Sequence, residues 1–158
     1  MEYRVLTLWE PWATLVVHGI KKIETRPKPT SWTVEKGTYL IHAAKKWSKE
    51  QEKVCLNDPF LEPLKGCFNF GHIIGSVEVK ECKKIPLLVA ESDREIYVCL
   101  YENFYVSWKE FDYGDYDPGR YAWLLQNPRI LETPIPYKGQ QGFYPRFKGD
   151  VDKLKFVE

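Results

Sequence analysis

The sequence is poor in the residues from which metal sites and redox motifs are built. Its four cysteines lie twelve, fifteen and seventeen positions apart without a Cys-x-x-Cys pair, so we expect neither a zinc ribbon nor a dithiol motif. It also lacks a phosphate-binding loop, a metal-binding helix motif and a nucleophile elbow, which disfavours a nucleotide triphosphatase and a dedicated metalloenzyme. We therefore predict no metal site and no cofactor.

Long apolar runs are missing as well. No stretch approaches the ~20 apolar residues that a membrane-spanning helix needs, and the charged Glu2 and Arg4 near the start are unlike a signal peptide. We therefore expect a cytoplasmic protein with no membrane partner. In that reducing compartment the cysteines are expected to be small buried apolar residues.

The chain has no overall excess of positive or negative charge, because it contains 23 Lys and Arg residues and 22 Asp and Glu residues. The distribution is nevertheless uneven. Residues 1–53 carry ten basic and six acidic side chains, residues 54–118 carry six and twelve, and residues 119–158 carry seven and four. If the two basic stretches pack together, they form a basic face that suits a nucleic-acid partner. The alternative is a solvated surface of mixed charge.

The N-terminal part predicts a strand, a short helix and a second extended segment. Residues 3–8 alternate in the manner of a strand that is buried on much of both faces. Pro11 suits the first turn of a helix that ends at Gly19, the residue type that closes helices in the left-handed conformation. Pro27 then stops a new helix, so residues 20–26 are expected to be extended.

Further along the chain the pattern favours two more strands and a helix before a final strand. Residues 38–44 alternate, and the Ser48-x-x-Gln51 pair is typical of a capping box that opens a helix. The run from His72 to Cys82 has the pattern of a half-buried strand, and residues 121–126 alternate in the same way. The length of 158 residues is that of one domain.

Three charged side chains, Lys21, Glu24 and Arg26, follow the expected helix end within six residues. In a strand Glu24 and Arg26 share one face, about 6.5 to 7 Å apart, while the preceding turn aims Lys21. The three polar ends can therefore converge on one site. The alternative is a surface ladder of ion pairs, worth about 0 to 1 kcal/mol.

The spacing Gly19-x-Lys21-x-x-Glu24-x-Arg26 resembles the signature of the ASCH domain family, a branch of the PUA-like superfamily. Four other stretches continue the resemblance, the last two being similar to longer prokaryotic and phage members: residues 6–13, 40–46, 119–128 and 134–143. The resemblance implies an α+β fold, a PUA-like mixed β-barrel with peripheral helices. It implies a single domain over residues 1–158, with an acidic, aromatic-rich insertion at about residues 84–118.

The function that the resemblance implies is binding of RNA or a nucleic-acid component in a groove at the signature. The expected partner is RNA, single-stranded nucleic acid or a modified nucleoside, and the sequence identifies no protein partner. Arginine can clamp a phosphate or a base edge, tryptophan can stack on an unpaired base, and glycine lets backbone amides approach a ligand. The expected binding residues are Lys21, Glu24, Arg26, Trp9, His42, Lys45, Lys46 and Gly142.

The resemblance also implies an enzymatic alternative. Some small family members resemble hydrolases that deacylate N4-acetylated cytidine with the motif lysine, a threonine and a more distant glutamate. In this chain Lys21 would be the base or nucleophile, Glu24 stands where those members have threonine, and Glu78 is the candidate distant carboxylate. A third hypothesis is a regulatory protein-interaction module, in which the acidic residues 84–118 cover a partner.

Overall fold

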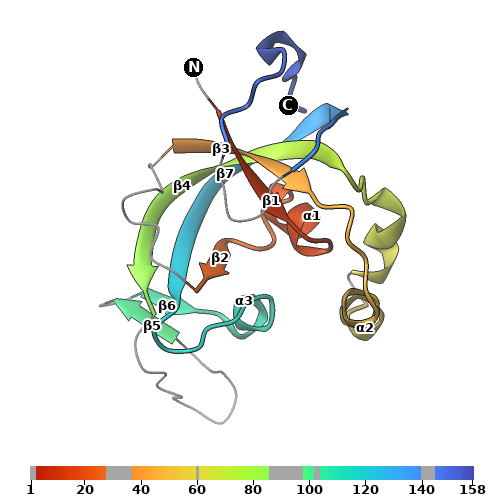
Figure 1. Ribbon diagram of the computed structural model, residues 1–158. Coiled ribbons are helices and arrows are strands. Elements are labelled where there is room, and N and C mark those ends of the chain that lie inside the picture. Colours follow the sequence, from red (N-terminus) through yellow and green to blue (C-terminus); the bar gives the residue numbers. More distant parts are fainter. Residues whose placement is uncertain (1–2, 28–36, 60, 86–97, 102–103, 140–144) are drawn as a thin grey trace. The chain divides into compact units, whose positions relative to one another are not determined.

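The structure is a computed structural model that describes residues 3–27, 37–59, 61–85, 98–101, 104–139 and 145–158. Strands, α-helices and short 3-10 helices (η) alternate along the chain (Figure 1). In chain order they are β1 (Arg4–Leu8), α1 (Trp12–Val17), β2 (Ile23–Arg26), β3 (Gly37–Ala43), α2 (Lys49–Asn57), η1 (Glu62–Cys67), β4 (His72–Lys84), β5 (Val98–Tyr101), β6 (Phe104–Val106), α3 (Trp108–Asp112), β7 (Tyr121–Pro136) and η2 (Val151–Lys153).

Five strands form a mixed sheet in the order β1-β3-β4-β7-β2, and β5 and β6 form a separate two-stranded sheet. β1 runs parallel to β3, with Leu6 opposite Ile41, whereas β2 runs antiparallel to β7. The mixed sheet with a few helices confirms the expected PUA-like α+β fold. The expected closure into a barrel is wrong for the described strands, since β1 and β2 end the sheet without pairing with each other.

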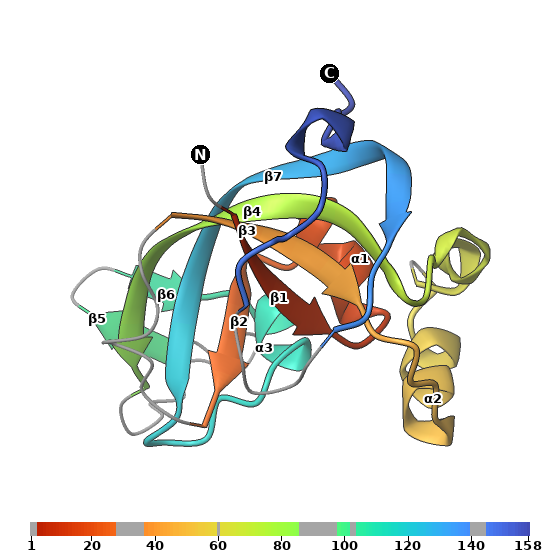
Figure 2. The same cartoon turned by 45° about the horizontal axis from the view of Figure 1, so that its top comes forward.

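The C-terminal segment explains why β1 does not need a closing strand. Val5 donates a backbone hydrogen bond to the carbonyl of Pro145, and Phe147 donates one to the carbonyl of Tyr3. The edge of β1 is therefore covered by the returning chain, which satisfies backbone groups that would otherwise be exposed. Farther on, Phe156 forms a bridge with Leu131 of β7. Figure 2 shows this C-terminal segment in dark blue.

The chain divides into two compact units, and each is described by itself. The first unit comprises Met1–Ile20, Thr38–Val77 and Asn127–Glu158, and the second comprises Lys21–Gly37 and Glu78–Gln126. The buried core of the first unit includes Val5, Leu40, Ile73 and Leu131. The buried core of the second unit includes Ile23, Ile85, Val106, Tyr116, Ala122 and Leu124. Each unit thus has apolar side chains of its own to hold its site residues.

Local sequence signals set the ends of α1 and α2 as predicted. Gly19 adopts φ +73°, and the hydrogen bonds from Gly19 to Val16 and from Ile20 to Leu15 close α1 in a Schellman motif. The hydroxyl of Ser48 accepts from the backbone N–H of Gln51 and opens α2. In the sequence, Lys21 and β2 follow shortly after this cap.

Two expectations about burial need correction. β4 is not half-buried along its whole length, because Ile73 to Val77 are buried on both faces and exposed positions appear only from Lys80. Val17 of α1 packs closely over Gly75, which covers the second face of β4. Among the described cysteines Cys55 is buried, but Cys67 is exposed, since η1 is a surface turn without buried residues.

None of the helices in the described ranges has the length and apolar character needed to cross a bilayer.

Candidate functional site

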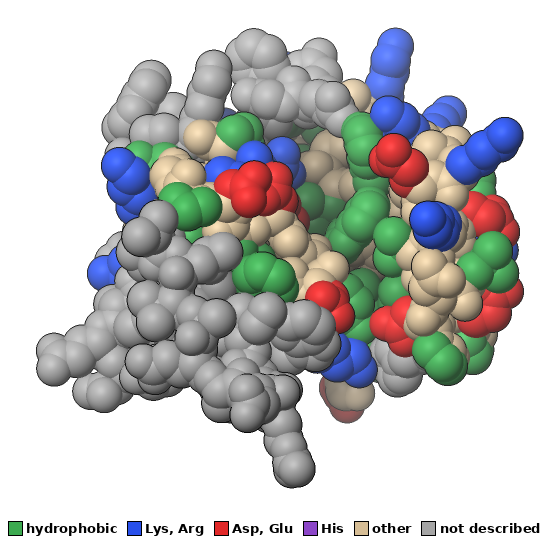
Figure 3. Space-filling view, turned by 90° about the horizontal axis from the view of Figure 1, so that it is seen from below, with side chains coloured by type: hydrophobic (Ala, Val, Ile, Leu, Met, Phe, Trp, Pro, Cys, Tyr) green, Lys and Arg blue, Asp and Glu red, His purple; other side chains and the backbone are tan. Residues whose placement is uncertain are grey.

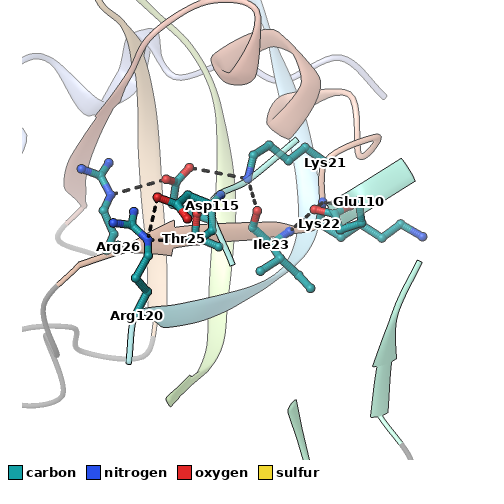
Figure 4. A network of polar contacts seen from close by, with 9 residues as sticks. Lys21, Lys22, Ile23, Thr25, Arg26, Glu110, Asp115 and Arg120 are labelled. Carbon is teal, nitrogen blue, oxygen red and sulfur yellow. Dashed lines mark hydrogen bonds and ion pairs between the residues drawn. The ribbon is translucent and has the colours of Figure 1, made fainter. Parts of the chain in front are cut away.

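The signature residues Lys21, Glu24 and Arg26, here called the signature cluster, form a chain of charges at β2 in the second unit (Figure 4). The ammonium of Lys21 donates to the carbonyl oxygen of Ile23 and lies 3.8 Å from Glu24 Oε2. Glu24 Oε1 lies 3.5 Å from Arg26 Nε. The predicted convergence of these three side chains is therefore present in the fold.

Exposure rises along the signature cluster. The side chains of Lys21, Glu24 and Arg26 are 2%, 12% and 25% exposed, respectively. A buried ammonium is stable only when it is paired and hydrogen-bonded, which Glu24 and the Ile23 carbonyl provide. Solvent can consequently reach Arg26 and the edge of Glu24, whereas Lys21 lies beneath them.

Trp123 supplies an aromatic ring beside the signature cluster. In the antiparallel pairing of β2 with β7, Trp123 lies opposite Glu24, and the guanidinium carbon of Arg26 lies 5.9 Å from its ring centroid. That distance is at the outer limit of a cation–π contact. Trp123 is fully buried, so it supports Arg26 from below instead of offering an open stacking surface.

Glu110 is a site residue that the sequence analysis missed. It belongs to α3, where Ser107 caps the helix by accepting from the N–H of Glu110. The Glu110 carboxylate accepts backbone hydrogen bonds from Lys22 at 3.0 Å and from Ile23 at 2.9 Å (Figure 4). The Ser107-x-x-Glu110 spacing of a capping box was the one local signal for this helix.

The environment of Glu110 raises its pKa above the ordinary carboxyl value. Burial is the largest cause, and the hydrogen bond from Lys22, the charge of Lys21 and the hydrogen bond from Ile23 oppose it in part. Glu110 and Glu24 together place two carboxyl groups against the cations Lys21 and Arg26. Each cation of the signature cluster therefore has a carboxyl group beside it.

The remaining predicted residues of the groove lie in the first unit. The ammonium of Lys46 lies 3.9 Å from the ring centroid of Trp9, so these two residues form a cation–π pair. His42 and Lys45 line a pocket of about 710 Å³. Gly142 lies outside the described residues. The structure therefore places the predicted binding residues in two groups, one in each unit.

A match to a protein-family model identifies the family of this chain. The family model described as the ASCH domain matches residues 6–134. The chain belongs to the ASCH domain family. This family has a PUA-like fold that is often linked to RNA binding.

Solved structures of an ASCH protein from Zymomonas mobilis are similar to this chain. The crystal structure of that protein shares 15% identity at a TM-score of 0.47, covering 96% of this chain and 90% of its own. A serine-to-alanine mutant of that protein shares 18% identity at a TM-score of 0.49 with the same coverage. A tyrosine-to-phenylalanine mutant shares 20% identity at a TM-score of 0.44, covering 85% of this chain and 76% of its own.

Glu78, the predicted distant carboxylate of this ASCH domain, lies on β4 and is half-buried. Its Oε2 accepts a hydrogen bond from Gln126 Nε2 at 3.2 Å. The role of Glu78 stays a prediction, and Glu110 is a second candidate because its carboxyl group interacts with the charge of Lys21. Thr25, on the opposite face of β2, accepts a hydrogen bond from the backbone of Asp115.

Within the described part of the ASCH domain, no three His, Cys, Asp or Glu side chains lie close enough together to hold a metal ion.

Proposed function

We propose that this ASCH domain binds a nucleic-acid component, a base or nucleoside that is free or part of single-stranded RNA, at the signature cluster. The observation that carries the proposal is the arrangement of Arg26 and Glu24 side by side at 3.5 Å, partly exposed above the buried Lys21. A guanidinium next to a carboxylate offers donors and acceptors in a fixed order. Base edges are recognised by such directional hydrogen bonds.

Charge balance argues for a base and against a phosphate at this cluster. The carboxyl groups of Glu24 and Glu110 already interact with Lys21 and Arg26, so little positive potential is left for a phosphate. A neutral base instead gains from hydrogen bonds to groups that are held in place before it arrives. Arg26 and Glu24 are the contact residues in this proposal, and Lys21 positions Glu24.

The first test is calorimetric titration with nucleosides and a short single-stranded RNA. Arg26→Ala is expected to weaken binding at least about tenfold, which corresponds to about 1.4 kcal/mol. Arg129→Ala is the matched control, because Arg129 also lies over an aromatic ring, 4.1 Å from Phe156, but in the first unit. Absence of micromolar binding by the wild type at low salt, or equal effects of both substitutions, would contradict the proposal.

A second candidate function is an amidohydrolase for N4-acylated cytidine. The observation in its favour is Glu110, a buried carboxyl group that feels the charge of Lys21 and whose raised pKa is typical of acid–base sites. Hydrolysis would consume one water molecule and release cytidine and a carboxylic acid. The lysine would act as base or nucleophile only after losing its proton, which a neighbouring carboxylate can accept.

Mass spectrometry of the ligand after incubation distinguishes the two functions. If the chain is an amidohydrolase, N4-acetylcytidine loses its acyl group with the wild type and not with Lys21→Ala. Lys22→Ala is the control. The Lys22 side chain is exposed, and the substitution keeps the hydrogen bond from the Lys22 backbone N–H to Glu110. A ligand of unchanged mass supports binding alone.

A further inference from the structure

The pocket of about 710 Å³ in the first unit contains no residue of the signature cluster. It lies where β1, β3 and β7 end and where β4 begins. Its described lining residues include Thr7, His42, Lys45, Gly71, Lys138 and Gly139. The volume is in the range of sites that hold a nucleotide-sized molecule, about 300 to 1,000 Å³.

The charged side chains among these lining residues are all basic. Lys45 and Lys138 are exposed lysines that follow β3 and β7, and none of the described lining residues is acidic. This pocket therefore differs from the signature cluster, whose cations are neutralised by carboxyl groups. An anion would meet uncompensated positive charge here.

His42 adds a buried hydrogen-bonding group to the pocket. It is 4% exposed, and its Nδ1 lies 3.1 Å from the hydroxyl of Thr7, the residue opposite it in the parallel pairing. Its Nε2 is buried and has no hydrogen-bond partner of normal geometry among the described residues, with the backbone of Tyr137 close to the ring. A buried polar nitrogen of this kind needs a partner, and a ligand oxygen in the pocket can supply one.

The surroundings of His42 favour the neutral form of its ring. Burial lowers its pKa from the ordinary 6.5, the backbone of Tyr137 opposes this in part, and the charges of His72 and Lys45 lower the pKa further. A neutral imidazole with Nδ1 facing a hydroxyl can carry its proton on Nε2. That nitrogen can then donate to a ligand oxygen.

Two glycines let the backbone hold these side chains in place. A Cβ atom at Gly139 would lie 2.6 Å from Thr7 Oγ1, and one at Gly71 would lie 2.7 Å from Lys45 Cε. Gly71 also has φ +75°, which other residues rarely adopt. Its N–H donates to Ala43 and its carbonyl accepts from Tyr137, so the β3, β4 and β7 ends are tied together.

We propose that this pocket binds the phosphate group of a nucleotide-sized ligand. Lys45 and Lys138 contact the phosphate oxygens as point charges, and His42 Nε2 donates one hydrogen bond. The phosphate comes either from a nucleoside monophosphate or from the backbone of RNA. This site stands independently of the proposed function, because its residues and those of the signature cluster do not overlap.

Calorimetric titration with uridine and with uridine monophosphate tests the site. The monophosphate is expected to bind the wild type at least about tenfold more tightly than uridine, and the double variant Lys45→Ala/Lys138→Ala should lose this difference. His42→Gln should reduce it without removing a charge. Lys49→Ala/Lys53→Ala is the control, since it removes two exposed lysines from α2 and should retain the preference.

The outcomes separate this proposal from that for the signature cluster. Equal affinities for uridine and its monophosphate, or equal effects of the two double variants, would overturn the phosphate site whatever Arg26→Ala does. If the dinucleotide UpU without a terminal phosphate gains the same lysine-dependent affinity, the phosphate is that of an RNA backbone. If only the monophosphate gains it, the ligand is a free nucleotide.

Discussion

One side chain, Glu110, holds the backbone that leads into the signature. Its carboxylate accepts from the consecutive N–H groups of Lys22 and Ile23, which precede or begin β2. Because Ile23 is buried, its N–H has no access to water if the carboxylate is removed. Glu110 therefore positions Lys21 by fixing the two residues that follow it.

Glu110→Ala should destabilise the protein by roughly 1–3 kcal/mol, the usual cost of an unsatisfied buried backbone group. Glu110→Gln should cost less, because the amide oxygen can still accept from Ile23. Chemical denaturation of both variants measures the difference. Equal free energies of unfolding for Glu110→Ala and the wild type would show that these hydrogen bonds contribute nothing to stability.

The raised pKa of Glu110 also predicts a pH dependence. Its folded pKa lies above the ordinary 4.5, so its contribution to stability is fully present below pH 4.5 and is lost as pH rises through the folded pKa. The free energy of unfolding of the wild type minus that of Glu110→Gln should therefore fall from pH 4 to pH 8. Glu10 also has a raised pKa, but it is present in both proteins and cancels. A difference that rises with pH would be contrary to this account.

At the level of elements, β4 packs against its neighbours through a glycine. A Cβ atom at Gly75 would lie 2.8 Å from Val17 Cγ1 of α1 and would also meet the carbonyl oxygen of Arg129 in β7. No flexible side-chain end can move aside to make room, because one neighbour is a branched core residue and the other is backbone. The close approach of α1, β4 and β7 therefore requires glycine at this position.

Gly75→Ala should destabilise the protein by about 1–3 kcal/mol through overpacking. Gly66→Ala in η1 is the control, since nothing lies within 4 Å of a Cβ atom there. The two midpoints of denaturation are to be compared in the same buffer. If the midpoints of the two variants coincide, the packing around Gly75 is loose enough to accept a methyl group, which would contradict this prediction.

Elements with local signals were predictable from the sequence, and long-range partners were not. The cap at Gly19 and the capping box at Ser48 depend on residues within five positions, so α1 and α2 could be placed. Glu110 meets Lys22 across 88 positions. No local sequence pattern predicts such a contact. None predicts the pairing of the C-terminal segment with the edge of β1 either.

Across the whole molecule, charge is balanced in number. The net charge is +1, and on the face drawn in Figure 3 the coloured acidic and basic side chains are interspersed. On that one face the coloured basic side chains do not form a continuous patch. Binding of RNA should therefore depend on particular side chains more than on a broad field.

The affinity for single-stranded RNA should consequently fall only gently with salt. If the pocket lysines Lys45 and Lys138 neutralise two phosphates, the slope of log K against log salt concentration is about −1.4. Titrations at several salt concentrations measure it, and Lys45→Ala/Lys138→Ala should bring it close to zero. A slope of about −5 or steeper would imply a broad basic surface that this account does not contain.

Zero-length photo-crosslinking shows whether the signature cluster contacts the base. Single-stranded RNA carrying thiouridine is irradiated with the protein, and the crosslinked peptides are mapped by mass spectrometry. We expect crosslinks within residues 21–26 or 121–126 that decrease in Arg26→Ala and persist in Arg129→Ala. Crosslinks confined to the first unit, with none in those two segments, would contradict it.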